Sequence, residues 1–264
     1  MNSKLTKFAL TATLVLAITF TFTACEEKKK QDSTTSTETE AAAETQETPR
    51  EAAAPPPTTL TDSRDNKTYK IVKIGEQVWM AENLNYEAKG SKCYGEGGKV
   101  TIIQYEEEDT FTTLSKAEIQ ANCSKYGRLY NWATAKTACP SGWHLPSNAD
   151  WNVLRKFVDS SCDNNSCTAG TKLKAKNGWS NTSDGESSNG TDAYGFSALP
   201  SGAFSSSNGS FYNNGYYGYW WGASDDNILY NWSMDSGQSL NNTSFSDDDS
   251  KGYDYSFSVR CIQN

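Results

Sequence analysis

Residues 68–81 read Thr-Tyr-Lys-Ile-Val-Lys-Ile-Gly-Glu-Gln-Val-Trp-Met-Ala. Polar and apolar residues alternate over 68–74, as in a half-buried strand, and residues 77–81 predict a second strand beside it. Gly75 and Glu76 between the two suit a type II′ turn, because glycine accepts the positive φ that its first central position needs. The stretch therefore predicts a β-hairpin near the start of a folded domain.

Helix signals follow the hairpin. Ser115 with Glu118, and Ser147 with Asp150, each place a hydroxyl acceptor three residues before an acid, which is the pattern of a capped helix start. The second pair opens a predicted helix over 148–158. Four apolar residues of that helix fall on one face, namely Trp151, Leu154, Phe157 and Val158.

The rest of the predicted elements are a helix and several short strands. The helix is expected over 126–138, and the aromatic-rich strands over 194–199, 219–223, 228–234 and 255–262. Helices come early and strands late, so we expect an α+β fold with a small, mostly antiparallel sheet.

The chain divides into three parts. Residues 1–24 combine a basic start with a short apolar run, which is typical of an export signal peptide and too short for a comfortable membrane span. Residues 25–59 contain no aromatic residue and many charged and small polar ones, so they are expected to form a disordered tether. All the tryptophans and tyrosines lie in 60–264, which we expect to be one domain.

Cys25 stands at the junction of the signal and the tether. The small residues before it resemble a bacterial lipobox, although Phe22 occupies the position where leucine is usual. This predicts lipid attachment at Cys25 and anchoring at the outer membrane or cell surface. Ordinary secretion, without a lipid, is the alternative.

Six cysteines remain after Cys25, an even number in a chain with an export signal, which indicates disulfides. Cys162 and Cys167 flank a turn-forming loop and are expected to pair. Of the pairings left open, Cys139 with Cys261 and Cys93 with Cys123 complete the set best. No Cys-x-x-Cys motif and a single histidine, His144, argue against a zinc site.

Several motifs resemble one known family. They are Ile74-Gly75-Glu76-Gln77-Val78-Trp79-Met80-Ala81-Glu82-Asn83-Leu84-Asn85, Tyr126-Gly127-Arg128-Leu129-Tyr130-Asn131-Trp132, Cys139-Pro140-Ser141-Gly142-Trp143-His144-Leu145-Pro146-Ser147, Asp192-Ala193-Tyr194-Gly195-Phe196-Ser197-Ala198-Leu199-Pro200 and Ser256-Phe257-Ser258-Val259-Arg260-Cys261. In this order they resemble the Fibrobacter succinogenes major paralogous domain family in its lipoprotein form. The resemblance implies an exported surface protein, and more distantly a C-type-lectin-like fold related to sulfatase-modifying factors.

Residues 201–255 consist mainly of Ser, Asn, Gly, Tyr and Asp, the residues enriched in antibody binding loops. They predict a ligand-binding face for polysaccharide, since sugar rings stack on aromatic side chains while Asp and Asn bind hydroxyls. Trp220 and Trp221 are adjacent, so in a strand they point to opposite faces and only one can serve that surface. The candidate residues are Tyr216, Tyr217, Tyr219, Trp220, Trp221, Asp225, Asp226, Asn227, Tyr230, Trp232 and Asp235.

Charge and composition restrict the function further. The net charge is −8 and residues 181–264 are strongly acidic, which excludes nucleic acid and disfavours anionic ligands at the aromatic face. No cofactor is expected, although the oxygen ligands around Asp225 would also suit calcium. No motif places the paired carboxylates of a glycoside hydrolase. We therefore expect a non-catalytic binding or adhesion domain for polysaccharide or a cell-surface protein, or alternatively a structural component of the envelope.

Overall fold

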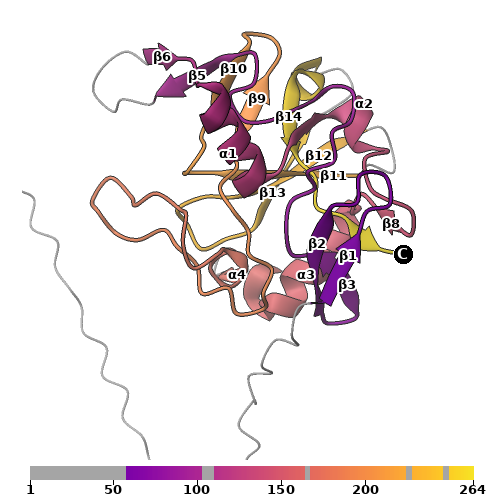
Figure 1. The fold of residues 1–264 in the computed structure, drawn as a ribbon. Helices are drawn as coiled ribbons and strands as arrows, with labels where there is room; N and C mark the ends of the chain where they lie inside the picture. The colour runs from indigo at the N-terminus through magenta and orange to yellow at the C-terminus, as the bar shows by residue number, and fades with distance from the viewer. Residues whose placement is uncertain (1–57, 103–109, 164–166, 224–227, 246–249) are drawn as a thin grey trace, which may run out of the picture. The chain divides into compact units, whose positions relative to one another are not determined.

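The computed structural model describes residues 58–102, 110–163, 167–223, 228–245 and 250–264. These ranges form an α+β fold of two sheets, four α-helices and two short 3₁₀ helices. The helices are α1 (Lys116–Tyr126), α2 (Trp132–Ala135), α3 (Asn148–Val158) and α4 (Ala169–Leu173), with 3₁₀ helices at Ser160–Asp163 and Ser250–Asp254. In Figure 1, α3 and α4 lie side by side, and α3 lies next to the smaller sheet.

The smaller sheet has five strands in the order β1-β2-β3-β15-β8. Its strands are β1 (Thr58–Thr61), β2 (Thr68–Ile74), β3 (Gln77–Met80), β8 (Trp143–His144) and β15 (Ile262–Gln263). The expected hairpin is confirmed: β2 pairs with β3, Ile74 faces Gln77, and Gly75 has φ +60°. The last strand of the chain pairs with this first hairpin through Ile262 and Trp79.

The larger sheet has the order β13-β12-β11-β14-β9-β10-β5-β6, with β7 paired to β14 and β4 paired to β7. Its strands are β4 (Ser91–Lys92), β5 (Lys99–Ile102), β6 (Thr110–Thr112), β7 (Leu129–Asn131), β9 (Ala203–Ser205), β10 (Ser210–Tyr212), β11 (Gly218–Gly222), β12 (Leu229–Met234), β13 (Asn241–Phe245) and β14 (Tyr255–Ser258). The single strand expected over 255–262 is therefore two strands. Residues 259–261 between them carry the chain from one sheet to the other.

Both expected capping boxes are present. The Ser115 and Ser147 side chains accept the backbone N–H of Glu118 and Asp150, and each acid bonds back to its serine. On α3, Trp151, Leu154 and Val158 are buried as expected. The fourth residue of the predicted face, Phe157, is 54% exposed. The Phe157 ring lies instead at the edge of the core, over Gly75 and against Tyr194.

Of the helix predicted over 126–138, only one turn is present, α2, and the rest of the prediction is wrong. Gly127, with φ +73°, ends α1, and a Cβ at this position would lie 2.8 Å from the Leu84 carbonyl oxygen. The following residues form β7, because Leu129–Asn131 find partners in β14 and β4. Asn131 then caps the single turn of α2 by accepting the backbone N–H of Thr134.

The strand predicted over 194–199 is also wrong. Residues 192–197 form a turn instead, in which Asp192 and Ser197 both have positive φ. The Asp192 carboxylate accepts the backbone N–H and the hydroxyl of Ser197, each at 2.7 Å. Local side-chain hydrogen bonds of this kind compete with strand pairing, which explains the difference.

Strand β11 divides the core. Trp220 packs with Trp151, while Trp221 packs with Trp132 and Phe257 in a second cluster. The two adjacent indoles therefore point to opposite faces, as expected, and both are fully buried. Because both faces are covered, this strand lacks the polar outer face of a half-exposed sheet.

The three expected disulfides are present: Cys93–Cys123, Cys139–Cys261 and Cys162–Cys167. Cys139–Cys261 ties the segment before β8 to the crossing between the sheets. Its partners are 122 residues apart in sequence, against 5 for Cys162–Cys167.

Removal of Cys139–Cys261 should destabilise the domain more than removal of Cys162–Cys167. In the chain-entropy model the long loop contributes about 4–5 kcal/mol and the short loop about 2 kcal/mol. Chemical denaturation of the double variants Cys139→Ala with Cys261→Ala, and Cys162→Ala with Cys167→Ala, compares the two losses. An equal or reversed order would contradict the assignment of Cys139–Cys261 as the main covalent tie.

Replacing Trp232 by alanine should lower the free energy of unfolding by roughly 3–5 kcal/mol, because a buried indole is truncated. Trp232 is 0% exposed and stacks on Trp151, with ring centroids 5.7 Å apart. Tyr230, two residues earlier on β12, is half-buried, so Tyr230→Ala should cost clearly less. Denaturant unfolding of both variants measures the difference, and similar losses would show that Tyr230 is a core residue too.

Candidate functional site

The structure corrects the predicted aromatic face. Trp220, Trp221 and Trp232 are each 0% exposed, so these three rings form the core and do not line a ligand surface. The physical reason is that the strands carrying them are covered on both sides. The Trp220 and Trp221 indole N–H groups are also used inside, by the Asn83 side-chain oxygen and the Tyr130 carbonyl.

The tyrosines lie closer to the surface. Tyr217 and Tyr219 are partly buried and stack, with centroids 5.5 Å apart and planes 4° apart. Burial raises the pKa of Tyr219 to about 12, and its hydroxyl accepts the Asn213 side-chain N–H at 3.0 Å. Tyr216 is 38% exposed and is the most accessible of the predicted rings that the structure describes.

Of the predicted acidic and amide ligands, the structure describes Asp235, whose charge acts on the Tyr219 hydroxyl. Asp225, Asp226 and Asn227 lie outside the described residues. The Asp235 carboxylate accepts the backbone N–H of Gly237 at 2.7 Å and so stabilises its own turn. No group of three His, Cys, Asp or Glu residues suited to a metal occurs within the described ranges. His144 bonds Asn264 at 2.7 Å, as expected of a structural histidine.

Tyr216 lines a cleft of about 400 Å³, here called the tyrosine cleft. It lies between β5, α1 and the segment joining β10 to β11. Its lining residues are Tyr94, Val100, Thr101, Leu114, Glu118, Asn122, Asn213, Asn214 and Tyr216. The turn that presents Tyr216 is fixed by Asn213, whose φ of +63° lets its carbonyl accept the backbone N–H groups of residues 216 and 217.

Three side-chain amides of the tyrosine cleft share one arrangement. The Nδ2 atom of Asn122 donates to the Tyr94 carbonyl, that of Asn213 to the Tyr219 hydroxyl, and that of Asn214 to the Pro200 carbonyl. None of the side-chain hydrogen bonds between described residues uses the Oδ1 atoms of these three amides. The cleft thus holds oriented amides with acceptor oxygens that remain available.

A polar cluster at the centre of the domain was missed by sequence reasoning. The Asn83 Oδ1 atom accepts Nε and Nη2 of Arg260 at 3.2 and 2.9 Å, and the Trp220 indole N–H at 2.8 Å. Its Nδ2 atom donates to the Tyr126 carbonyl at 2.9 Å and to the Ser258 hydroxyl at 3.3 Å. One buried amide therefore makes five hydrogen bonds to four residues from distant parts of the chain. We call it the Asn83 node.

Arg260 is 1% exposed, and all its hydrogen-bond acceptors are neutral: besides Asn83, they are the carbonyls of Phe196 and Ser197. No carboxylate of the described residues lies within ion-pair distance of it. Burial lowers the pKa of Arg260 to about 9, while Asp192 and Glu82 act in the opposite direction from further away. Arg260 still carries its charge at neutral pH.

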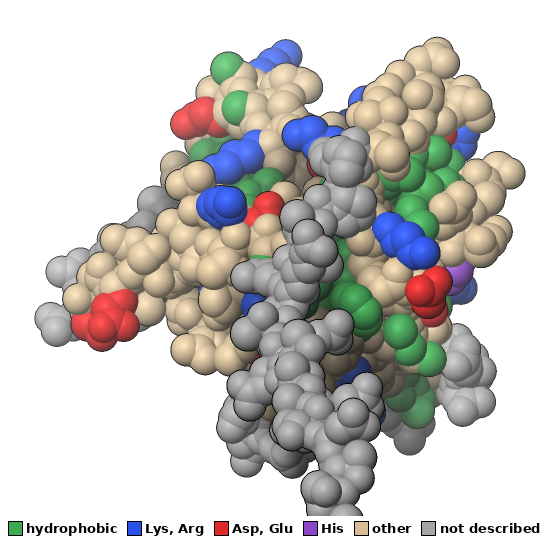
Figure 2. All heavy atoms as spheres, turned by 90° about the horizontal axis from the view of Figure 1, so that it is seen from below, with side chains coloured by type: hydrophobic (Ala, Val, Ile, Leu, Met, Phe, Trp, Pro, Cys, Tyr) green, Lys and Arg blue, Asp and Glu red, His purple; other side chains and the backbone are tan. Residues whose placement is uncertain are grey.

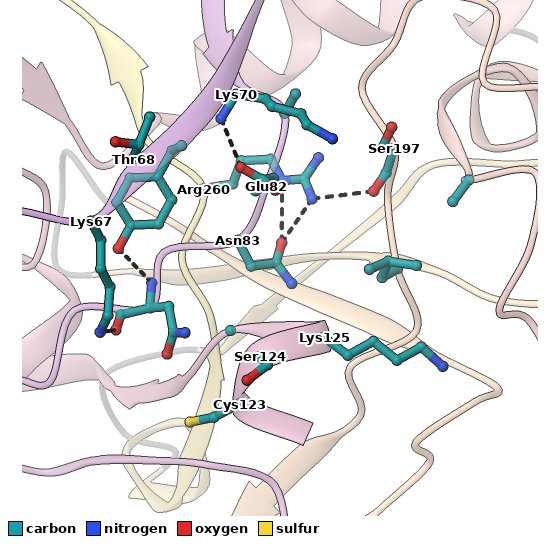
Figure 3. A pocket seen from close by; sticks show the side chains of 16 residues that line it. Lys67, Thr68, Lys70, Glu82, Asn83, Cys123, Ser124, Lys125, Ser197 and Arg260 are labelled. Atoms are coloured by element: carbon teal, nitrogen blue, oxygen red, sulfur yellow. Dashed lines mark hydrogen bonds between the residues drawn. The ribbon is translucent and has the colours of Figure 1, made fainter. Parts of the chain in front are cut away.

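Arg260 lies at the floor of a second cleft, of about 490 Å³, here called the cationic cleft. In Figure 3, Arg260 and Asn83 lie in the middle of the view, with Lys70 above and Lys125 below. The lining comes from β2, the segment after β3, the end of α1 and the loops around residues 175 and 197. Three lysines line it (Lys67, Lys70 and Lys125), and Glu82 is the carboxylate among its lining residues.

Sequence signals for these residues existed in part. The motifs quoted above contain all but one of the residues around this node, namely Asn83, Tyr126, Phe196, Ser258 and Arg260. Nothing in the sequence separates Asn122 or Asn214 from the many other asparagines. The described part of the chain contains no helix long and apolar enough to cross a membrane.

The comparisons agree with the motif evidence. Residues 72–263, most of the chain and nearly all of the described part, match the family model described as the Fibrobacter succinogenes major domain. No curated protein and no solved structure matches. The expected C-type-lectin-like fold therefore stays a prediction. The chain belongs to the Fibrobacter succinogenes major domain family.

Proposed function

We propose that this domain is a non-catalytic binding module for a neutral polysaccharide, which it binds in the tyrosine cleft. The observation that carries the proposal is the set of three oriented amides beside the exposed Tyr216 ring. A tyrosine ring offers an apolar face for sugar C–H groups, and fixed acceptor oxygens suit a ligand rich in hydroxyl donors.

The amides favour a hydroxylated ligand. Each Asn side chain is held by its Nδ2 atom, so the Oδ1 atom needs little reordering when a hydroxyl approaches. Ordering costs that are met before binding raise affinity. The Glu118 Oε2 atom accepts the Ser115 N–H and hydroxyl at 2.7 Å each, and its Oε1 atom makes no hydrogen bond to a described residue.

The charge of the cleft favours a neutral ligand. Hydrogen bonding from Ser115 lowers the pKa of Glu118, which is therefore ionised at neutral pH and repels anions. Glu118 is also the one carboxylate among the lining residues of this cleft. Glycoside hydrolysis ordinarily uses two carboxyl groups flanking the bond, so binding without cleavage fits this site better.

The proposal includes the placement of the domain. Lipid attachment at Cys25 would hold it at the outer membrane or cell surface, with residues 26–59 as a spacer, and a C-type-lectin-like fold would suit a recognition role. These parts rest on the sequence: the apolar run before Cys25 and the polar segment after it.

A second function, as a protein-binding component of the envelope, is favoured by a different surface. Val153 and Phe157 lie one turn apart on α3 and are each 54% exposed. Figure 2 looks at the side of the molecule where α3 lies and shows hydrophobic side chains among mostly neutral polar surface. Failure to bind any polysaccharide would favour this alternative.

Replacing Tyr216 by alanine should weaken polysaccharide binding by about 5- to 150-fold, equivalent to 1–3 kcal/mol for an anchoring aromatic residue. The free energy of unfolding should hardly change, since the ring is exposed. Affinity electrophoresis in gels containing soluble xylan, mannan, xyloglucan or mixed-linkage glucan measures the retardation of each variant.

The matched control is Tyr253→Ala. Tyr253 is 50% exposed, and it is not among the lining residues of the tyrosine cleft. This variant should bind like the parent. Equal retardation of all three proteins in every gel, or retardation of none, would refute the tyrosine cleft as a polysaccharide site.

Replacing Cys25 by serine should move the protein from the membrane fraction to the soluble fraction, because the attachment point of the lipid is lost. The domain should keep its unfolding transition, since Cys25 lies outside 60–264. Fractionation and immunoblotting of cells expressing each form test this. A Cys25→Ser protein that still sediments with membranes would contradict lipid anchoring.

A further inference from the structure

The cationic cleft differs from the tyrosine cleft in its charge. Lys67, Lys70, Lys125 and Arg260 contribute to its lining, against Glu82. Lys67 is matched by Asp65, with its Nζ atom 3.1 Å from the carboxylate. Glu82 balances one of the other three cations, so the lining of the cleft carries two positive charges in excess. The whole chain, by contrast, has a net charge of −8. The composition of the chain therefore does not account for this excess.

The two exposed lysines lack carboxylate partners. No acidic side chain of the described residues lies within ion-pair distance of the Lys70 or Lys125 amine. Lys125 lies over the Tyr126 ring at 4.6 Å, and Glu82 uses its Oε2 atom for the Lys70 backbone N–H at 2.7 Å. Both amines are thus free to approach an anion in the cleft.

Arg260, at the floor of the cationic cleft, adds a third positive charge that attracts an anion in the cleft. Its guanidinium is buried among neutral acceptors, so its charge is poorly screened by water. Asp192, which is bonded to Ser197, weakens this field but lies outside the lining. A cleft with low-dielectric walls and one sign of charge concentrates its potential on whatever enters.

The neutral lining indicates what else the ligand carries. The Asn85 side-chain amide makes no hydrogen bond to another described side chain, and the Ser124 hydroxyl donates to the Gln120 carbonyl while its oxygen can still accept. Ala81, Ala175 and Leu199 supply apolar surface. Polar groups for hydroxyls, apolar contacts for C–H groups and a volume of about 490 Å³ match a sugar ring better than a bare ion.

We propose that the cationic cleft is a second binding site, which takes a carboxylate-bearing sugar, that is, a hexuronate residue. The carboxylate would lie between Lys70 and Lys125 above Arg260, and the ring would contact Asn85, Ser124 and Leu199. This site shares no lining residue with the tyrosine cleft. The proposal can therefore be tested independently of the neutral polysaccharide proposed for the tyrosine cleft.

The test compares trigalacturonate with its fully methyl-esterified form, which keeps the rings and removes the charges. Isothermal titration calorimetry with the full chain should show binding of the acid and at least tenfold weaker binding of the ester. The double variant Lys70→Gln with Lys125→Gln should lose about tenfold in affinity for the acid, as expected for two partly exposed charge contacts. Both lysines are exposed, so the fold should survive.

Three controls make the result decisive. Lys89→Gln with Lys116→Gln changes the net charge equally at exposed lysines outside the lining, and should bind like the parent. Tyr216→Ala should leave trigalacturonate binding unchanged, whereas a loss would show one shared site and overturn the proposal. Inorganic phosphate should compete poorly; competition at equal concentration would indicate a simple anion site and overturn the uronate assignment. Absence of trigalacturonate binding, equal binding of the ester, or no effect of the two lysine substitutions would also overturn it.

Discussion

The side-chain amide of Asn83 is the constraint on which the rest of the domain depends. It lies directly after the first hairpin and is 7% exposed. From there it binds the end of α1, the indole of Trp220 on β11, and the last strand region through Ser258 and Arg260. A buried polar cluster stabilises one arrangement when its members are satisfied and is costly when they are not. Few other arrangements of these segments would satisfy this amide.

The Asn83 node also explains why the family motifs occur together. Arg260 donates to the carbonyls of Phe196 and Ser197, which belong to the turn after Asp192. Tyr126 supplies a carbonyl because Gly127 turns the chain immediately afterwards. Cys261, next to Arg260, is bonded to Cys139. Four of the five motifs thus contribute to a single buried centre, and the fifth, 139–147, is tied to it by the disulfide at the residue next to Arg260.

Local patterns in the sequence predicted local structure well. The Gly75 turn and the capping boxes at Ser115 and Ser147 depend on residues within a few positions, and all three are present. The prediction over 194–199 failed because the Asp192 carboxylate holds Ser197 in a turn, and the prediction over 126–138 failed because distant strands decide that segment. Leu129–Asn131 became a strand through its pairing with β14, which follows more than a hundred residues later.

The candidate site was harder to predict because the aromatic residues have two uses. In a chain of which 36% is hydrophobic, large rings must provide much of the core. Trp220, Trp221 and Trp232 do so, although their surroundings in sequence resemble a binding loop. Tyr216 differs from them through the Asn213 turn, which holds it outside the strand. The exposure of the Tyr216 ring depends on the geometry of this turn, which the amino-acid composition does not predict.

Helix α1 connects the two clefts and helps to determine their opposite charges. Glu118 in its first turn and Asn122 line the tyrosine cleft, whereas Ser124 and Lys125 near its end line the cationic cleft. The partial charges of a helix favour acids at its start and bases at its end. The charge that stabilises each end of α1 is therefore also the charge presented to the adjoining cleft. The Cys93–Cys123 disulfide fixes the helix between them. One helix thus gives the two clefts different charges, because the acid that suits its start and the base that suits its end each line the cleft beside them.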